Sequence, residues 1–210
     1  MRLNREASRL KHFVRAALVA GLIQAAPMAW AADDPAAGTI ARVYASFESA
    51  LKESPKDVAA RAATISGPVR ESFDFAAMVR LAVGAKWKSF TPEQQATLTD
   101  AFGRYFTATY ATRLAQAAGG KFTVKPQSDA RGPNRVVQTE VANKDGDTSQ
   151  IDFLLGPDNR VQDVYLNGNV SEVASLRGSF AEPLKAGGAD ALLTFMRDRT
   201  TGMLAAKPAP

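Results

Sequence analysis

The sequence predicts an α+β protein in which a four-stranded antiparallel meander sheet packs against several helices. Apolar residues recur at helical spacing from residue 37 to residue 118. They alternate at strand spacing from residue 121 to residue 167, and helical spacing returns after residue 171. Helices that flank a block of strands in this way are typical of the α+β class.

The first 31 residues have the layout of a cleaved secretory signal peptide. Basic residues up to Arg15 precede an apolar run, and Ala29-Trp30-Ala31 supplies the small residues of a cleavage site. The alternative is a retained membrane anchor. The apolar run from Ala16 to Ala26 is too short for one, because a spanning helix needs ~20 apolar residues. We therefore expect cleavage near Ala31 and export of residues 32–210.

Removal of residues 1–31 changes the chemistry that the chain can perform. This segment holds five of the 26 basic and one of the 21 acidic side chains, so the remainder has a net charge of +1 and no basic surplus for a nucleic-acid partner. The segment also contains the only histidine, His12, and the sequence has no cysteine. Ser-His-Asp and Cys-His catalysis, zinc sites with nitrogen or sulfur ligands, and disulfides are therefore excluded.

Helical spacing over 37–52 predicts the first helix after the signal peptide. We expect Ser54 as N-cap and Pro55 as first residue of a second helix, with a break or kink at Gly67-Pro68. A third helix should follow Asp74 as N-cap and end at Gly84.

The run Thr91-Pro92-Glu93-Gln94 is a capping-box signature that opens a long helix. This helix should continue to about Ala118, before Gly119-Gly120. One broad face of it is rich in aromatic residues. That face is either plain core or the wall of an apolar cavity between helix and sheet, and periodicity alone does not separate the two.

Four strands are expected, over 121–125, 135–142, 149–155 and 160–167, with turns at Asp145-Gly146 and at 156–159. Asp152 and Asp163 should face outward, opposite the apolar side of their strands. Ser171 should cap the first of two closing helices, which Gly187-Gly188 separates. The domain is expected to span 32–206, followed by a flexible tail over 207–210.

From Phe73 onward the sequence resembles the MlaC family of periplasmic lipid-binding proteins, also called the toluene-tolerance or ABC-transporter auxiliary family. The resemblance covers about residues 40–205. In the first half it is carried by Phe73, Asp74, Phe75, Leu81, Gly84, Trp87, the run 91–94 and Tyr110. In the second half it is carried by the run 163–168, Ser171, Phe180, Gly187-Gly188 and the run 192–196. The runs 137–139, 171–174 and 177–180 are more similar to the branch of the family associated with hopanoid biosynthesis.

The resemblance implies a periplasmic shuttle that carries a phospholipid or a hopanoid and breaks no bond. Its implied partners are an inner-membrane ABC transporter with an MCE-type protein and an outer-membrane complex. It implies no cofactor other than the bound lipid and no metal, and we expect a monomer. Two alternatives remain: a non-enzymatic adaptor that binds proteins and no lipid, and a cavity enzyme that uses Asp or Tyr for proton transfer.

If the cavity exists, alternation and helical spacing select the side chains that would line it. On the helices these are Phe75, Met78, Val79, Phe102, Phe106 and Tyr110. On the sheet they are Val137, Ile151, Phe153, Val164 and Leu166. For a polar headgroup at the mouth, the candidates are Arg80, Tyr105 and Arg113.

Overall fold

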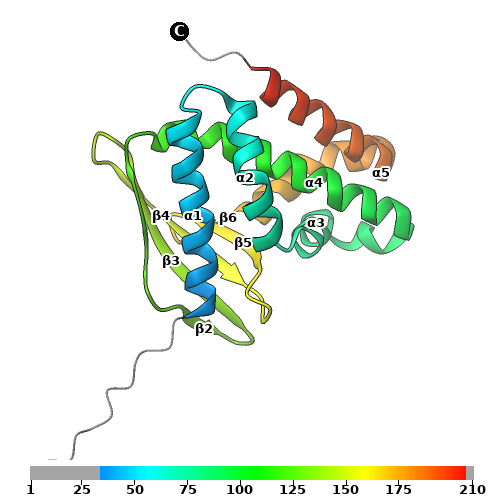
Figure 1. Cartoon of the computed structure of the whole chain (residues 1–210). Helices are drawn as coiled ribbons and strands as arrows, with labels where there is room; N and C mark the ends of the chain where they lie inside the picture. Colours follow the sequence, from blue (N-terminus) through cyan, green and yellow to red (C-terminus); the bar gives the residue numbers. More distant parts are fainter. Residues whose placement is uncertain (1–33, 207–210) are drawn as a thin grey trace, which may run out of the picture. The chain divides into compact units, whose positions relative to one another are not determined.

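Residues 34–206, which this computed structural model describes, form helices, then strands, then a bent helix (Figure 1). The signal peptide expected over 1–31 and the tail expected over 207–210 lie outside the described residues. The helices are α1 (Pro35–Glu53), α2 (Val58–Ser72), α3 (Phe75–Val83), α4 (Pro92–Arg113) and α5 (Glu172–Ala205), with 3-10 turns η1 (Gly84–Ser89) and η2 (Leu114–Ala117). The strands are β1 (Lys121–Val124), β2 (Asp129–Arg131), β3 (Asn134–Ala142), β4 (Thr148–Leu155), β5 (Val161–Leu166) and β6 (Val170–Ser171). The α+β prediction is confirmed.

The strands form one antiparallel sheet in the order β1-β3-β4-β5-β6. β2 also pairs with β3, so that β1 and β2 occupy successive stretches of the same edge. The predicted count of four strands is too low. The two additional strands, β2 and β6, have three and two residues, which is too short for alternation to reveal them.

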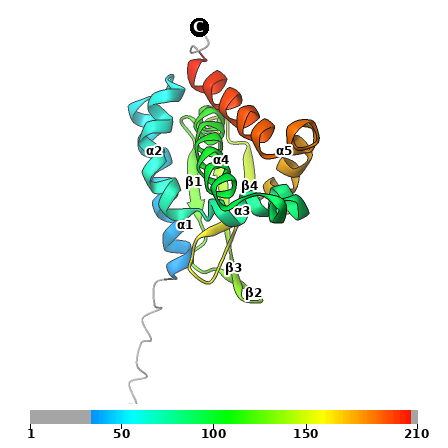
Figure 2. The same ribbon diagram turned by 90° about the vertical axis from the view of Figure 1, so that its right-hand side faces the viewer.

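Helices cover one face of this sheet. α1 packs on β1 and β3, while α3 and α5 contact β5. α4 lies between α2 and α5 (Figure 2). None of the helices within residues 34–206 combines the length and apolar character needed to cross a membrane.

Three of the predicted helix starts are confirmed by their caps. At the start of α5, the Ser171 hydroxyl accepts a hydrogen bond of 3.0 Å from the Ala174 N–H. The Asp74 carboxylate accepts a hydrogen bond of 3.0 Å from the Ala77 N–H, and α3 ends at Gly84 with a positive φ of 70°. At the start of α4, the Gln94 N–H donates to the Thr91 hydroxyl at 3.2 Å, and the Thr91 N–H donates to the Gln94 side chain at 3.1 Å. This reciprocal pair is the capping box that the sequence predicted.

The predicted start of the second helix is wrong, and the helix does not break at Gly67-Pro68. Asp57, rather than Ser54, caps α2, because residues 54–56 are held as a loop in which the Ser54 N–H bonds back to the Ala50 carbonyl of α1. The helix then continues through Gly67-Pro68 to Ser72. Ile65 and Val69, on either side of the proline, are fully buried. Their burial outweighs the hydrogen bond that a proline removes from a helix interior.

The long helix ends earlier than predicted, at Arg113, where the chain tightens into η2 up to Ala117. The two closing helices appear as one bent element, α5. Its bend lies at Gly187 and Gly188, which have non-helical backbone angles, and Gly188 has a φ of 60°. The expected separation at these glycines is therefore confirmed as a sharp bend.

Asp152 and Asp163 are buried, contrary to the prediction that they face solvent. The Asp163 carboxylate accepts hydrogen bonds from the Ser171 hydroxyl at 2.6 Å and the Val173 N–H at 3.1 Å. It thereby ties β5 to the first turn of α5, where N–H groups have no partner within the helix. Asp152 lies between Gln138 and Tyr165 on the neighbouring strands, and Gln150 donates to it at 2.9 Å.

Candidate functional site

An open pocket of about 560 Å³ lies between α1, the end of α4, η2 and the inner face of the sheet. Ligand pockets in proteins have volumes of about 300–1,000 Å³ and mostly apolar walls. The apolar wall consists of Tyr44, Phe47, Tyr110, Leu114, Ala117, Phe122, Val141, Ile151, Phe153 and Leu166. Its polar lining consists of Arg113, Gln116, Asn143, Asp147, Ser149 and Asn167.

Strand register explains why the sheet divides into a pocket half and a core half. Paired residues of an antiparallel sheet share a face. Ile151 is paired with Thr139 and Leu166, and this row lies towards the hairpin that connects β3 and β4. The row containing Val137, Phe153 and Val164 lies farther from that end and is almost completely buried. Phe153 belongs to this buried row and also borders the pocket.

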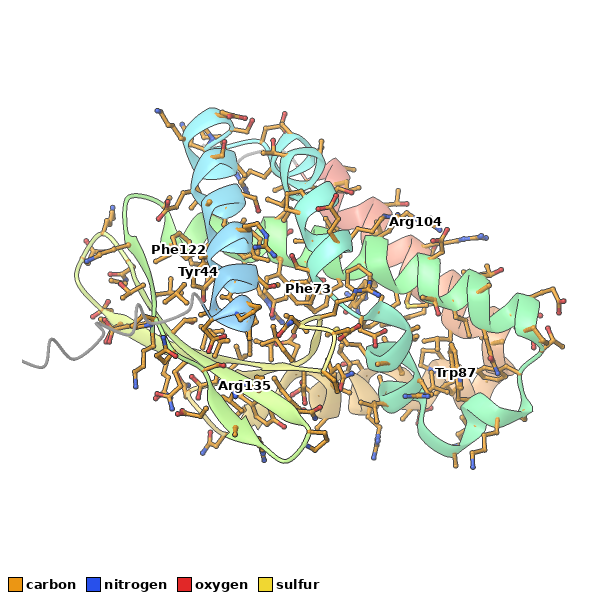
Figure 3. All side chains as sticks on the ribbon, turned by 60° about the horizontal axis from the view of Figure 1, so that its bottom comes forward. Tyr44, Phe73, Trp87, Arg104, Phe122 and Arg135 are labelled. Atoms are coloured by element: carbon orange, nitrogen blue, oxygen red, sulfur yellow. The ribbon has the colours of Figure 1, made fainter. Side chains whose placement is uncertain are left out.

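Helix α1 supplies two aromatic side chains to the pocket, Tyr44 and Phe47. The Tyr44 ring lies 4.9 Å from the Phe122 ring, and Figure 3 shows the two side chains together between α1 and the sheet. The Tyr44 hydroxyl bonds to the Thr139 hydroxyl at 2.6 Å, and Thr139 donates to the Ile151 carbonyl at 2.5 Å. Burial raises the pKa of Tyr44 above its ordinary value, so its hydroxyl stays neutral.

Tyr110 forms the wall between the pocket and the core. Its ring stacks on Phe106 with centroids 4.4 Å apart and an interplanar angle of 24°. The Tyr110 hydroxyl is buried and has no hydrogen-bond partner within residues 34–206. Burial, and next the negative charge of Glu172, raise the pKa of Tyr110 far above its ordinary value. The Tyr110 hydroxyl is therefore neutral, and the residue forms part of the pocket wall.

Arg113, the last residue of α4, contributes a charged side chain to the pocket lining. Its guanidinium donates to Glu172 at 2.8 Å, and its side chain is 48% exposed whereas that of Glu172 is 7% exposed. The guanidinium carbon also lies 5.8 Å from the centre of the Tyr110 ring. A guanidinium has five N–H groups, so the bond to Glu172 leaves donors that an anionic group at the mouth could use.

The structure places the predicted lining residues in three groups. Tyr110, Ile151, Phe153 and Leu166 line the pocket. Phe75 instead borders a separate space of about 280 Å³ between α2, α4 and α5. The others are fully or almost fully buried in the core: Met78, Val79, Phe102, Phe106, Val137 and Val164.

Of the three headgroup candidates, the structure places only Arg113 at this pocket. Arg80 lies on α3 in a different depression, near Trp87, and Tyr105 packs against Phe180 and Phe195. Figure 3 shows Trp87 far from Tyr44 and Phe122. Within residues 34–206, acidic side chains do not gather into a group that could hold a metal ion.

Sequence reasoning missed the pocket residues Tyr44, Phe47, Leu114, Phe122 and Val141. Tyr44 and Phe47 belong to the apolar stripe of α1, and Phe122 and Val141 point to the inner face of paired strands. Each of these four residues therefore lies on an apolar face that the sequence pattern predicts. The pairing of β1 with β3 beneath α1, which brings them together, is a tertiary contact that periodicity does not contain.

Comparison with families of known proteins gives a match to MlaC, described as MlaC protein, over residues 38–198. The chain belongs to the MlaC family. Comparison with curated protein sequences gives no significant match. Among solved structures, a protein from Ralstonia solanacearum has a TM-score of 0.67 and 24% sequence identity, over 80% of this chain and 98% of the other. That protein is described as a phospholipid-binding protein in complex with a phospholipid, solved at 1.53 Å. The MlaC resemblance seen in the sequence is thus confirmed, and the fold is shared over 80% of this chain.

Proposed function

We propose that this protein is a periplasmic carrier that binds a membrane lipid, a phospholipid or a hopanoid, and transfers it between membrane-bound complexes. The proposed partners are an inner-membrane ABC transporter with an MCE-type protein and an outer-membrane complex. The signal peptide expected over 1–31 fits this location. Such a carrier acts by binding alone, and it needs neither a catalytic group nor a metal.

The observation that carries the proposal is the open pocket walled by Tyr44, Phe47, Phe122, Ile151 and Leu166 in an MlaC-family fold. Each CH₂ group of a lipid chain gains about 0.8 kcal/mol when it leaves water. A pocket with this apolar wall therefore offers a favourable environment for hydrocarbon. Arg113 at the lining adds a cation that suits a headgroup phosphate, with charge-assisted hydrogen bonds.

The amount of lipid that remains bound to the protein through purification tests the function directly. The mature protein, exported in cells and purified without detergent, should yield close to one lipid per protein on organic extraction and mass spectrometry. Ile151→Arg and Leu166→Arg place a charge against the chain and should reduce the retained lipid at least tenfold, because both side chains line the pocket.

The matched control for these variants is Leu81→Arg. Leu81 is a 45% exposed apolar residue on α3, outside the pocket lining, and its variant should retain lipid like the parent protein. Circular dichroism and thermal unfolding establish that each variant is folded. Lipid-free wild-type protein that takes up nothing from phosphatidylglycerol vesicles or from vesicles that also contain a hopanoid would refute the carrier function.

A further inference from the structure

One residue of the pocket wall carries a buried polar atom that no other protein group bonds. Within residues 34–206, the buried side-chain oxygens and nitrogens without a hydrogen bond are the Tyr110 hydroxyl and Asp152 Oδ1. Asp152 precedes Phe153 on β4 and therefore faces away from the pocket, because side chains alternate along a strand. Of the two groups, only the Tyr110 hydroxyl belongs to the pocket lining.

Tyr44, the other tyrosine of the pocket lining, has the partner that Tyr110 lacks. Its hydroxyl shares a hydrogen bond of 2.6 Å with the Thr139 hydroxyl. Most buried polar groups in proteins are paired in this way. A buried hydroxyl without a partner lowers the stability of the protein that contains it. A bound molecule that supplies an acceptor to Tyr110 would remove this cost.

The packing of the Tyr110 ring holds its hydroxyl in place. The ring stacks on Phe106 with centroids 4.4 Å apart, and the Phe47 ring lies 6.2 Å away. Burial keeps the pKa of Tyr110 far above its ordinary value, so the hydroxyl retains its proton and can donate it in a hydrogen bond. A donor that is already fixed in position binds an acceptor with little further loss of entropy.

The pocket lining places a cation, this hydroxyl and an apolar wall close together. The guanidinium carbon of Arg113, three residues after Tyr110 on α4, lies 5.8 Å from the centre of the Tyr110 ring. Ile151 and Leu166 belong to the apolar wall. A glycerophospholipid carries a phosphate, ester carbonyls and hydrocarbon chains in succession. With its phosphate at Arg113 and its chains against the apolar wall, its ester carbonyls would lie near Tyr110.

We propose that the Tyr110 hydroxyl donates a hydrogen bond to an ester carbonyl of the bound lipid and thereby selects lipids with ester-linked chains. This inference rests on the proposed carrier function and deepens it. Protein atoms cover the hydroxyl, and the half-exposed Arg113 side chain lies over the Tyr110 ring. A phosphate that draws Arg113 towards the mouth uncovers the hydroxyl for the carbonyl. An ether-linked lipid and the ring system of a hopanoid have no carbonyl to offer.

Competition between two matched lipids tests the proposal. Lipid-free mature protein is incubated with vesicles that contain dipalmitoyl and dihexadecyl phosphatidylglycerol in equal amounts, which differ only in their ester or ether linkages. Mass spectrometry of the repurified protein gives the ratio of the two bound lipids. The ester lipid should be favoured about fivefold by the wild type, as expected for one hydrogen bond, and this preference should disappear in Tyr110→Phe.

Tyr165→Phe is the matched control for the loss of a tyrosine hydroxyl. Tyr165 is paired with Asp152, so it lies on the face of the sheet opposite the pocket, and Arg131 lies over its ring. The lipid ratio of this variant should equal that of the wild type.

Two further measurements separate a hydrogen bond to lipid from a structural role of Tyr110. The infrared C=O band of bound dipalmitoyl phosphatidylglycerol, isotope-labelled at its carbonyl carbons, should lie at lower wavenumber in the wild type than in Tyr110→Phe. Lipid-free Tyr110→Phe should unfold at no lower temperature than the lipid-free wild type, because the hydroxyl that it removes has no partner within residues 34–206. Tyr44→Phe, which loses the bond to Thr139, should unfold at a lower temperature.

Two results would overturn the role of the Tyr110 hydroxyl while leaving the carrier function intact. The first is the same ratio of bound lipids in the wild type and in folded Tyr110→Phe. The second is lipid-free Tyr110→Phe that unfolds as far below the wild type as Tyr44→Phe does. Wild-type protein that takes up neither phosphatidylglycerol would refute a phospholipid carrier and, with it, the role of Tyr110.

Discussion

Asp34 is the residue that joins the start of the described chain to the edge of the sheet. One carboxylate oxygen accepts from the N–H groups of Ala36 and Ala37 in the first turn of α1. The other accepts from the Ser128 N–H at 2.8 Å, the Ser128 hydroxyl at 2.6 Å and Arg135 at 3.3 Å. The side chain is only 5% exposed, so a single residue caps a helix and also fixes it to β3.

These contacts give Asp34 a pH-dependent effect on stability. Burial would raise its pKa, but the hydrogen bonds, from Ser128 above all, outweigh burial and hold the pKa far below its ordinary value. A carboxylate with a lowered folded-state pKa stabilises the protein fully above its unfolded pKa of about 4, and this contribution is lost as pH falls.

Asp34→Asn should therefore lower the free energy of unfolding by about 1–3 kcal/mol at pH 7. The difference from wild type should shrink near pH 3. Urea unfolding at both pH values measures it, with Asp145→Asn in the exposed β3–β4 hairpin as the control. An equal loss at both pH values would show that the charge of Asp34 is not the cause.

At the scale of elements, the last turn of α4 is bonded to a buried arginine from another helix. The Arg61 side chain donates to the Ala111 carbonyl in the last turn of α4 at 2.8 Å, and to the Ser54 and Pro55 carbonyls at 3.1 and 2.9 Å. The residue is 1% exposed. A cation is favourable here, because the last carbonyls of a helix have no partner and carry partial negative charge.

Arg61→Met should lower the free energy of unfolding by about 3 kcal/mol, since it removes charge-assisted hydrogen bonds from a buried site. Arg70→Met on the same helix is the matched control. Arg70 is 63% exposed and lies 3.8 Å from Asp100, so its loss should cost less than about 1 kcal/mol. Chemical denaturation compares the two, and similar costs would contradict the role given to Arg61.

Sequence periodicity identified the inner faces of elements but not which part of each face lines the pocket. Phe106 and Tyr110 lie one turn apart on α4, yet Phe106 is in the core and only Tyr110 reaches the pocket. Val164 and Leu166 differ in the same way on β5. Core and pocket residues obey the same spacing. What separates them is how α1 and η2 lie on the sheet, which depends on contacts between distant segments.

At the scale of the whole molecule, the core and the pocket are continuous. One apolar cluster runs from Phe180 and Leu192 of α5 through Phe102 and Phe106 to Tyr44 at the pocket. A chain in the pocket would extend this cluster with buried hydrocarbon. Lipid binding and folding are therefore expected to be linked, since a ligand that binds only the folded state stabilises it.

Lipid removal should accordingly lower the Tm of the mature protein. At a free lipid concentration of 100 times Kd the stabilisation is about 2.7 kcal/mol, which corresponds to about 5–11 °C for a domain of this size. Monopalmitoyl phosphatidylglycerol and monopalmitoyl glycerol, which lacks the phosphate, should both raise the Tm in differential scanning calorimetry.

Arg113→Gln should reduce the effect of monopalmitoyl phosphatidylglycerol only, because the half-exposed Arg113 guanidinium is the cation at the pocket lining. Equal losses for both lipids would show that Arg113 supports the pocket wall and does not contact the phosphate.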